Sequence, residues 1–136
     1  MSRTLVICKP DAVERGLVGE ILGRFERKGL KLVAAELRLL DPELLGRHYE
    51  EHVGKGFYAD LVAFMSRSPA LVAVIEGPDD TFAIVRSMMG PTNPASAPSG
   101  TVRGDFGTVT TENLVHGSDS NESAEREIGI FFPGLV

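Results

Sequence analysis

The chain has 136 residues, of which 43% are hydrophobic and 24% are charged, a size and composition typical of a single globular domain. Its 14 Lys and Arg residues against 19 Asp and Glu residues give a formal net charge of -5, which argues against a dedicated nucleic-acid-binding protein because such proteins depend on clustered basic charge. The single cysteine, Cys8, excludes an internal disulfide framework and a metal site built from several cysteines.

The first third of the chain predicts a strand, a helix and a second strand. Residues 4–8 are a short apolar run stopped by Pro10, as expected of a buried strand. Apolar residues then recur at helical spacing over 18–25, and Gly29 stands where a helix end favours glycine. Residues 31–40 alternate well enough for a strand. The side chains expected on one face of this strand are Val33, Ala35, Leu37 and Leu39.

Two short helices and an apolar strand are predicted for the middle of the chain. Residues 41–43 (Asp-Pro-Glu) are typical of a helix start, with a capping carboxylate, a proline in the first turn and an acid near the positive end of the helix dipole. A second helix is expected over 57–65, after the glycine-rich break at 54–56, with its apolar stripe in the core. Residues 70–75 are continuously apolar, which makes them the best candidate for a central strand.

The last third predicts a helix, a long loop, a strand and a final helix. Asp79 or Asp80 is expected to cap a helix that ends near residue 89. Periodicity then disappears over 90–112, a stretch too long for a simple connection and too varied in composition for disorder, so we interpret it as an ordered functional loop. A short strand over 113–116 and a helix over 122–131 follow. The helix that ends near residue 89 is expected to direct Phe82, Val85 and Met89 to the core.

The order of these elements predicts the fold class. Strands and helices alternate along one uninterrupted domain, 1–136, with no internal repeat. Only four strands are convincing, so a split βαββαβ arrangement fits better than a doubly wound sheet. We therefore expect an α+β protein with one four-stranded sheet and helices packed against it.

His116 is the first candidate for a reactive group. It ends a predicted strand and is followed by a glycine and a polar turn, a place where scaffolds present functional side chains. Ser118 lies two residues away, and Glu127 lies on the helix that returns. A carboxylate or hydroxyl that holds one imidazole nitrogen leaves the other as a nucleophile or base. A surface histidine of no consequence, or a buried polar pair in an inert fold, fits the same pattern.

Three basic residues are the candidates for binding phosphate. Lys9 directly follows the first strand, Arg86 lies within a helix, and Arg103 stands among glycines. The planar fork of arginine suits phosphate oxygens, and lysine supplies a compact charge. Together they are able to hold a polyphosphate, although each one alone is also typical of a solvated surface charge. Because Arg103 falls in the predicted loop, we expect its replacement by alanine to lower turnover with little loss of folding.

Several kinds of site are disfavoured by the sequence. The chain has no G-x-x-x-x-G-K-[ST] phosphate loop and no G-x-G-x-x-G after its first strand. His48 and His52 have a metal-compatible spacing, but without a third ligand nearby a zinc site is not expected. No apolar run approaches the roughly 18 residues of a membrane span, and Lys9 comes too early for a signal peptide. We therefore expect no membrane contact and a cytoplasmic location.

Three segments resemble the nucleoside diphosphate kinase family, and the compact bacterial members most. They are 4–11 (TLVICKPD), 103–106 (RGDF) and 113–120 (NLVHGSDS), with further matches at 29–31, 92–94 and 122–128. The resemblance runs through essentially the whole chain in family order and spacing, and the histidine motif is highly specific. It implies a ferredoxin-like fold with an antiparallel sheet. It also implies ping-pong transfer, in which a nucleoside triphosphate phosphorylates His116 on Nδ1 and the phosphoryl group then passes to a nucleoside diphosphate.

The resemblance also implies roles for individual side chains, with broad acceptance of bases. Glu127 and Ser118 orient His116, and Tyr49 lies near the transferred group. Lys9 and Asn113 engage the ribose 3′ hydroxyl. The phosphates are bound by Arg86, Thr92 and Arg103 together with Lys9, and the base stacks on Phe57 with Leu61 beside it. Mg²⁺ is expected on the nucleotide phosphates with no direct protein ligand, Asp119 being a candidate for a water-mediated contact.

Departures from the family pattern concern the base rather than the chemistry. Gly56 precedes Phe57 where members often have proline, and Thr110 stands where many have valine. Family members are homo-oligomers, and we expect a hexamer rather than a tetramer, with Pro94 in a loop between subunits. The alternative function is a catalytically silent, ferredoxin-like nucleotide-binding or regulatory module that has kept the pocket.

Overall fold

The computed structural model describes residues 1–135, so Val136, the last residue of the predicted domain, lies outside the described residues. The strands are β1 (Ser2–Cys8), β2 (Lys31–Arg38), β3 (Ala70–Gly77) and β4 (Val115–Gly117). The helices are α1 (Pro10–Glu14), α2 (Val18–Arg27), α3 (Pro42–His48), α4 (Tyr58–Ser66), α5 (Thr81–Met89), α6 (Val102–Phe106) and α7 (Asn121–Phe131). Three short 3-10 helices are η1 (Glu50–His52), η2 (Pro94–Ser96) and η3 (Pro133–Leu135).

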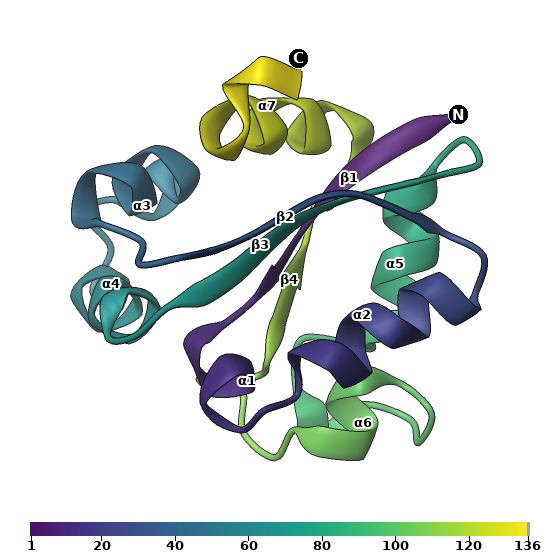
Figure 1. Cartoon of the computed structure of the whole chain (residues 1–136). Helices are drawn as coiled ribbons and strands as arrows, with labels where there is room; N and C mark the ends of the chain where they lie inside the picture. Colours follow the sequence, from purple (N-terminus) through teal and green to yellow (C-terminus); the bar gives the residue numbers. More distant parts are fainter. Residues whose placement is uncertain (136) are drawn as a thin grey trace.

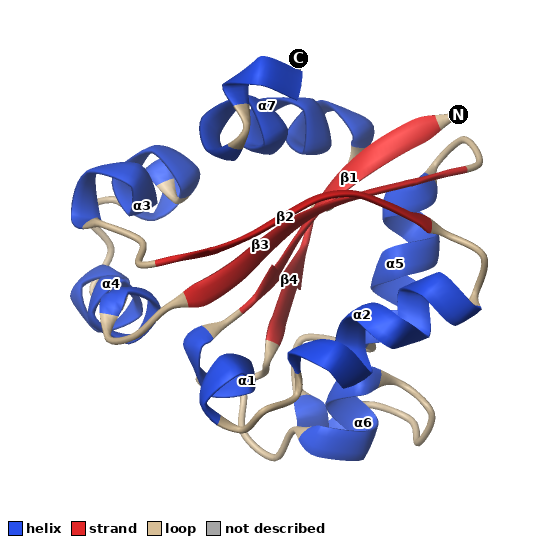
Figure 2. Ribbon diagram, in the orientation of Figure 1, coloured by secondary structure: helices blue, strands red, loops and turns tan. Residues whose placement is uncertain are grey.

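One antiparallel sheet with the strand order β2-β3-β1-β4 lies at the centre of the molecule (Figure 1). β1 pairs with β3 along its whole length and with β4 near its end, where Ile7 lies opposite His116. Helices cover both faces, with α3, α4 and α7 on one side and α1, α2, α5 and α6 on the other (Figure 2). The predicted four-stranded, ferredoxin-like α+β fold is therefore confirmed.

The central strands are apolar throughout because both of their faces are buried. Val6 and Cys8 of β1 point into the core beneath α2 and α5, whereas Leu5 and Ile7 pack against the elements on the α7 side. This alternation follows from the two-residue period of a strand. Since Ile7 and His116 are cross-strand neighbours on one face, His116 is presented to the α7 side.

The second strand differs from its prediction. Val33 and Ala34 both pack against the α7-side core, because a bulge between Leu32 and Ala34 shifts the register. A bulge moves the following residues to the opposite face from the one that simple alternation gives. Leu37 and Leu39, predicted on the same face as the core residue Val33, are 58% and 66% exposed. The predicted apolar face of this strand is therefore wrong beyond the bulge.

The stretch 90–112, predicted as a loop, contains η2 and the helix α6. The Thr101 hydroxyl caps α6 by accepting a hydrogen bond from the Gly104 amide. An ion pair of 2.8 Å between Arg24 and Asp105 ties α6 to α2. The interpretation of an ordered segment agrees with these contacts, but the assignment as a loop throughout is wrong.

Two smaller expectations about helices are corrected. Asp80 stands at the start of α5 with φ 61°, yet its side chain accepts from Asn121 instead of capping the helix. The amide of Thr81 is bonded by the Ser2 hydroxyl, which takes the place of the expected cap. In α4 only Met65 is fully buried, and Phe57, just before the helix, is 51% exposed. The stripe expected in the core there is therefore partly a surface feature.

Candidate active site

His116 is held through one ring nitrogen. Its Nε2 lies 2.9 Å from Oε1 of Glu127, and the Ser118 hydroxyl donates to the same oxygen at 2.8 Å. Glu127 reaches this position because it belongs to the buried face of α7. Ser118 is itself fixed to β1, since its oxygen accepts a hydrogen bond from the Leu5 amide. The predicted group of His116, Ser118 and Glu127 is thus brought together.

This arrangement determines which nitrogen is free. Burial alone raises the pKa of Glu127, but its hydrogen bonds with His116 and with the Ser118 hydroxyl help to outweigh burial, so the pKa lies below its usual value. The carboxylate is therefore ionised at neutral pH and accepts the Nε2 proton of the imidazole. The lone pair then resides on Nδ1, on a side chain that is 21% exposed. Nδ1 is the nitrogen available to react.

Replacing Glu127 by Gln tests this orientation. The amide keeps the size of the side chain but lacks the charge that fixes the tautomer, so we expect phosphorylation of His116 by ATP to slow by about tenfold or more. Stopped-flow or quench measurement of the first half-reaction checks the prediction. Glu125→Gln, the same change at an exposed position of α7, is the matched control and is expected to react at the normal rate. An equal rate in both variants would contradict the assignment.

Arg103 is buried, unlike the loop arginine that was predicted. It is 5% exposed on α6, and its guanidinium donates to three backbone carbonyls: Asn113 at 3.1 Å, Gly90 at 2.9 Å and Val115 at 2.6 Å. Burial, together with the charge of Arg86, lowers the pKa of Arg103 to about 10. The expectation that it contributes little to folding is therefore wrong, because it holds the chain at both ends of the 90–113 segment.

The other basic residues approach the same region from different elements. Arg86 is exposed on α5 and donates to the carbonyl of Gly117 at 3.0 Å. The Lys9 ammonium donates to Asn113 Oδ1 at 2.8 Å, and the Asn113 amide donates to the carbonyl of Thr92 at 3.0 Å. Burial and the neighbouring Arg103 lower the pKa of Lys9 to about 8. These contacts join the predicted phosphate and ribose residues around β4.

A cavity of about 400 Å³ opens beside Lys9. It contains both predicted base-contacting residues, Phe57 and Leu61, and also Thr110. The exposed ring of Phe57 is available for stacking. The complete lining is Lys9, Phe57, Asp60, Leu61, Phe64, Arg67, Thr110, Thr111 and Glu112. Arg67 is engaged by Glu14 and Glu112, so it helps to build the wall of the cavity.

Tyr49 is linked to His116 through the ring of His48. Its ring contacts His48, with centroids 4.4 Å apart, and stacks on His52 at 5.9 Å. Burial and the charge of Glu127 raise the pKa of Tyr49, so its hydroxyl stays protonated and able to donate at neutral pH. The His48 ring also lies against His116, with centroids 4.7 Å apart. Tyr49 therefore contacts His48, the ring that packs on His116, and its predicted place near the transferred group stays a prediction.

No role beside His116 was predicted for Asp11 and His48. Asp11 is buried, and its Oδ2 accepts from the amide of Leu114, whose φ of 77° marks the turn into β4. The order Lys-Pro-Asp after a strand was the available signal. His48 is buried, and neither ring nitrogen has a hydrogen-bond partner within residues 1–135. Its contact with His116 depends on the tertiary fold, which no local pattern reveals.

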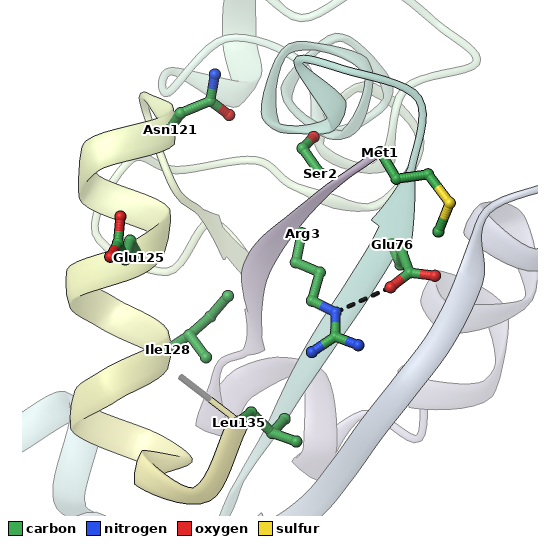
Figure 3. Close-up of a pocket in the computed structure, with 8 residues that line it drawn as sticks. All are labelled: Met1, Ser2, Arg3, Glu76, Asn121, Glu125, Ile128 and Leu135. Carbon is green, nitrogen blue, oxygen red and sulfur yellow. Dashed lines mark hydrogen bonds and ion pairs between the residues drawn. The ribbon is translucent and has the colours of Figure 1, made fainter.

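A second cavity of about 470 Å³ lies between the start of β1, the end of β3 and α7 (Figure 3). Its only arginine, Arg3, donates to Glu76 at 2.9 Å. The guanidinium of Arg3 is already paired, and the described lining contains no histidine. This cavity is therefore a poor site for phosphoryl transfer. The lining is Met1, Ser2, Arg3, Glu76, Asn121, Glu125, Ile128 and Leu135.

Among the described helices, none combines the length and apolar character needed to cross a membrane.

Known proteins match this chain over nearly its whole length. The family model described as nucleoside diphosphate kinase matches residues 2–135. The nucleoside diphosphate kinase of Streptomyces griseus is 55% identical over 134 residues, covering 98% of this chain and 97% of that protein. A nucleoside diphosphate kinase family protein from Babesia bovis superposes with a TM-score of 0.95 at 45% identity, covering 99% and 90% of the two chains. The nucleoside diphosphate kinase of Halobacterium salinarum, solved with CDP, superposes with a TM-score of 0.92 at 45% identity, covering 96% of this chain and 87% of that one. This chain therefore belongs to the nucleoside diphosphate kinase family and is a nucleotide phosphotransferase.

Proposed function

We propose that His116 carries the phosphoryl group between two nucleotides, in a ping-pong reaction at one site. The observation that supports this is the hydrogen bond between His116 Nε2 and Glu127, which leaves Nδ1 free to act as the nucleophile. A covalent intermediate lets donor and acceptor use the same contacts in turn. Both half-reactions then need the same in-line geometry and the same neutralised oxygens.

The first half-reaction proceeds by attack of the Nδ1 lone pair on the γ-phosphorus. The bond from that phosphorus to the β–γ bridging oxygen breaks, and the nucleoside diphosphate leaves with the electron pair. The ring keeps its Nε2 proton, and the Glu127 carboxylate stabilises the positive charge that develops on the imidazole. In the second half-reaction, a terminal oxygen of the acceptor diphosphate attacks phosphorus and the imidazole is the leaving group.

The cationic side chains bind and orient the polyphosphate. Arg86, Arg103 and Lys9 supply three positive charges around the strand that bears His116, and Thr92 is proposed to add a hydroxyl. Each charge-assisted hydrogen bond is worth about 1.5–3 kcal/mol. The three basic groups therefore provide enough binding energy for phosphate in a chain that is acidic overall. Asn113 is proposed to engage the ribose together with Lys9, to which it is hydrogen-bonded.

Mg²⁺ is proposed to travel with the nucleotide, where it neutralises phosphate oxygens. Mg²⁺ prefers oxygen ligands. The one cluster of three potential metal ligands within residues 1–135 contains two histidines, so it does not suit Mg²⁺. This supports binding of Mg²⁺ through the nucleotide phosphates rather than through the protein. Asp119 is exposed and its pKa is lowered, first by the Ser123 hydroxyl and also by Arg86. It is therefore an ionised carboxylate suited to a water-mediated contact.

The base is proposed to bind in the cavity beside Lys9, stacked on Phe57. Stacking uses a face that all bases share, which favours broad specificity. The relative from Halobacterium salinarum was solved with CDP, a pyrimidine nucleotide. A methyl group at Gly56 would meet no atom within 4 Å, so the structure gives no steric reason for glycine in front of Phe57.

A pH dependence follows from the lowered pKa of Lys9. The ammonium is charged below pH 8 and neutral above it, so phosphate binding weakens as pH rises. We expect kcat/KM for ADP to fall by up to about tenfold per pH unit above that value, since this ratio reports the free enzyme. Arg103, with a pKa of about 10, keeps its charge over most of this range. Lys9→Arg is expected to remove the decline between pH 8 and 9.5, and a flat wild-type profile would contradict the prediction.

Transfer from ATP to UDP distinguishes this function from the silent-module alternative. The proposed enzyme forms UTP with parallel lines in double-reciprocal plots, as a ping-pong scheme requires. A silent module binds nucleotide and forms no UTP. Intersecting lines with normal turnover would instead indicate direct transfer between two bound nucleotides.

We also propose a homo-oligomer, with a hexamer favoured over a tetramer, and a cytoplasmic location. β2 is an edge strand, and Leu37 within it and Leu39 just after it are largely exposed. Open edges and exposed leucines favour association with another chain. Pro94 is buried in η2, within the segment expected between subunits. Native mass spectrometry is expected to give six copies, and a monomer would contradict the proposal.

A further inference from the structure

A buried group with no partner lies behind the reactive histidine. His48 is 4% exposed, and both of its ring nitrogens are buried without a hydrogen bond in the described chain. The His48 ring packs edge to face on the ring of His116, with centroids 4.7 Å apart. An unsatisfied buried polar atom is costly, and its persistence calls for an explanation.

The donors around His48 form a set that suits a transition metal. One nitrogen of His48, one of His116 and one oxygen of Glu127 all lie within 4.8 Å of one another. No other group of three such ligands occurs among residues 1–135. Two imidazoles and a carboxylate are a known donor set for zinc, whereas Mg²⁺ takes oxygen ligands. The Glu127 carboxylate supplies the negative charge that a buried cation requires.

The geometry is close to that of a bound ion. A tetrahedral zinc ion with bonds of about 2.0–2.1 Å places its ligands about 3.4 Å apart. Nε2 of His116 and Oε1 of Glu127 are 2.9 Å apart. The rings of His48 and His116 pack edge to face with an interplanar angle of 81°. The three donor atoms lie within 4.8 Å of one another, so side-chain rotations have to bring them closer together for coordination. A fourth position is left for water, as in zinc sites with three protein ligands.

We propose that His48, His116 and Glu127 form an inhibitory binding site for Zn²⁺ or a similar soft divalent cation. Coordination through Nε2 of His116 replaces the hydrogen bond to Glu127. The imidazole then carries its one proton on Nδ1, so the proton changes nitrogen and none is lost. Nδ1 has no lone pair in this tautomer and is unable to attack phosphorus. This inference goes beyond the proposed function, since metal binding is measurable without any turnover.

The first experiment measures zinc binding without nucleotide, by competition with a chromophoric chelator at pH 7.5. The wild-type protein is expected to bind one Zn²⁺ per chain, and His48→Asn to bind at least tenfold more weakly. His52→Asn is the matched control, because this neighbouring histidine lies outside the cluster, and it is expected to bind normally. Equal affinity in wild type and His48→Asn would overturn the site.

A second measurement needs no variant. The zinc X-ray absorption spectrum of the wild-type complex is expected to show two imidazoles with oxygen ligands and no sulfur. A sulfur ligand, or fewer than two imidazoles, would contradict the proposal. In the inhibition assay, a metal buffer sets the free Zn²⁺ concentration, and Zn²⁺ is expected to slow phosphorylation of His116 by ATP in the wild type. The His48→Asn variant is expected to need an at least tenfold higher free Zn²⁺ concentration for the same inhibition. If His116 proves not to be the nucleophile, zinc binding remains and only its inhibition is lost.

Discussion

His116→Ala is expected to abolish phosphotransfer, lowering turnover by more than about 10⁴-fold, while the protein stays folded. The substitution removes the only group proposed to bond to phosphorus. The structural loss is small, because the His116 side chain makes one hydrogen bond, to Glu127, and that carboxylate keeps the Ser118 hydroxyl. Turnover with ATP and UDP, and label incorporated from γ-labelled ATP, are the measurements.

The label itself identifies the residue. A phosphohistidine is labile in acid and stable in alkali, so the wild type should give label with both properties. His52→Ala is the matched control, since it removes a different histidine from the same side of the molecule, and it is expected to retain the label. Acid-labile label that survives in His116→Ala would mean that the nucleophile is elsewhere.

Arg103→Ala is expected to damage stability and activity together. The side chain is buried and donates to the carbonyls of Gly90, Asn113 and Val115, all of which lose a charged donor. We expect the free energy of unfolding to fall by about 3 kcal/mol, and Tm by roughly 10 °C. Turnover should fall by about 100-fold or more, because the same guanidinium is proposed to face phosphate. Calorimetry and steady-state assays measure the two effects.

Arg86→Ala separates the two roles. Arg86 is exposed and donates to one carbonyl, that of Gly117. Its loss should lower Tm by less than about 3 °C, while turnover falls as strongly as for Arg103→Ala. Equal thermal stability of the two variants would contradict the structural role of Arg103. Normal turnover in Arg86→Ala would contradict its role in binding phosphate.

Local patterns were sufficient for most of the fold. The apolar runs of β1 and β3 and the periodic faces of α2 and α7 are long enough to be read without tertiary information. The five-residue helices α1 and α6 were missed, because a helix of that length has little periodicity and depends on packing. The bulge in β2 was also missed, since a single added residue changes the face without leaving a clear sequence signal.

Part of the candidate site was also predictable from the sequence, and part was not. Ser118 and Glu127 were predicted beside His116 because all three lie within twelve residues, on a strand, a turn and the helix that returns. Family resemblance, rather than pattern, placed Phe57, Leu61, Thr92 and Asn113. The backbone contacts of Arg103 and the packing of His48 on His116 join segments far apart in the chain, so only the structure reveals them.

The central claim, that His116 carries the phosphoryl group between nucleotides, is tested most directly with isolated phosphoenzyme. The protein is labelled with γ-labelled ATP, freed of nucleotide by gel filtration, and mixed with GDP in a single-turnover experiment. The account predicts that nearly all label appears as GTP, at a rate no slower than steady-state turnover. Label that stays on the protein, or that is released only as inorganic phosphate, would contradict the account.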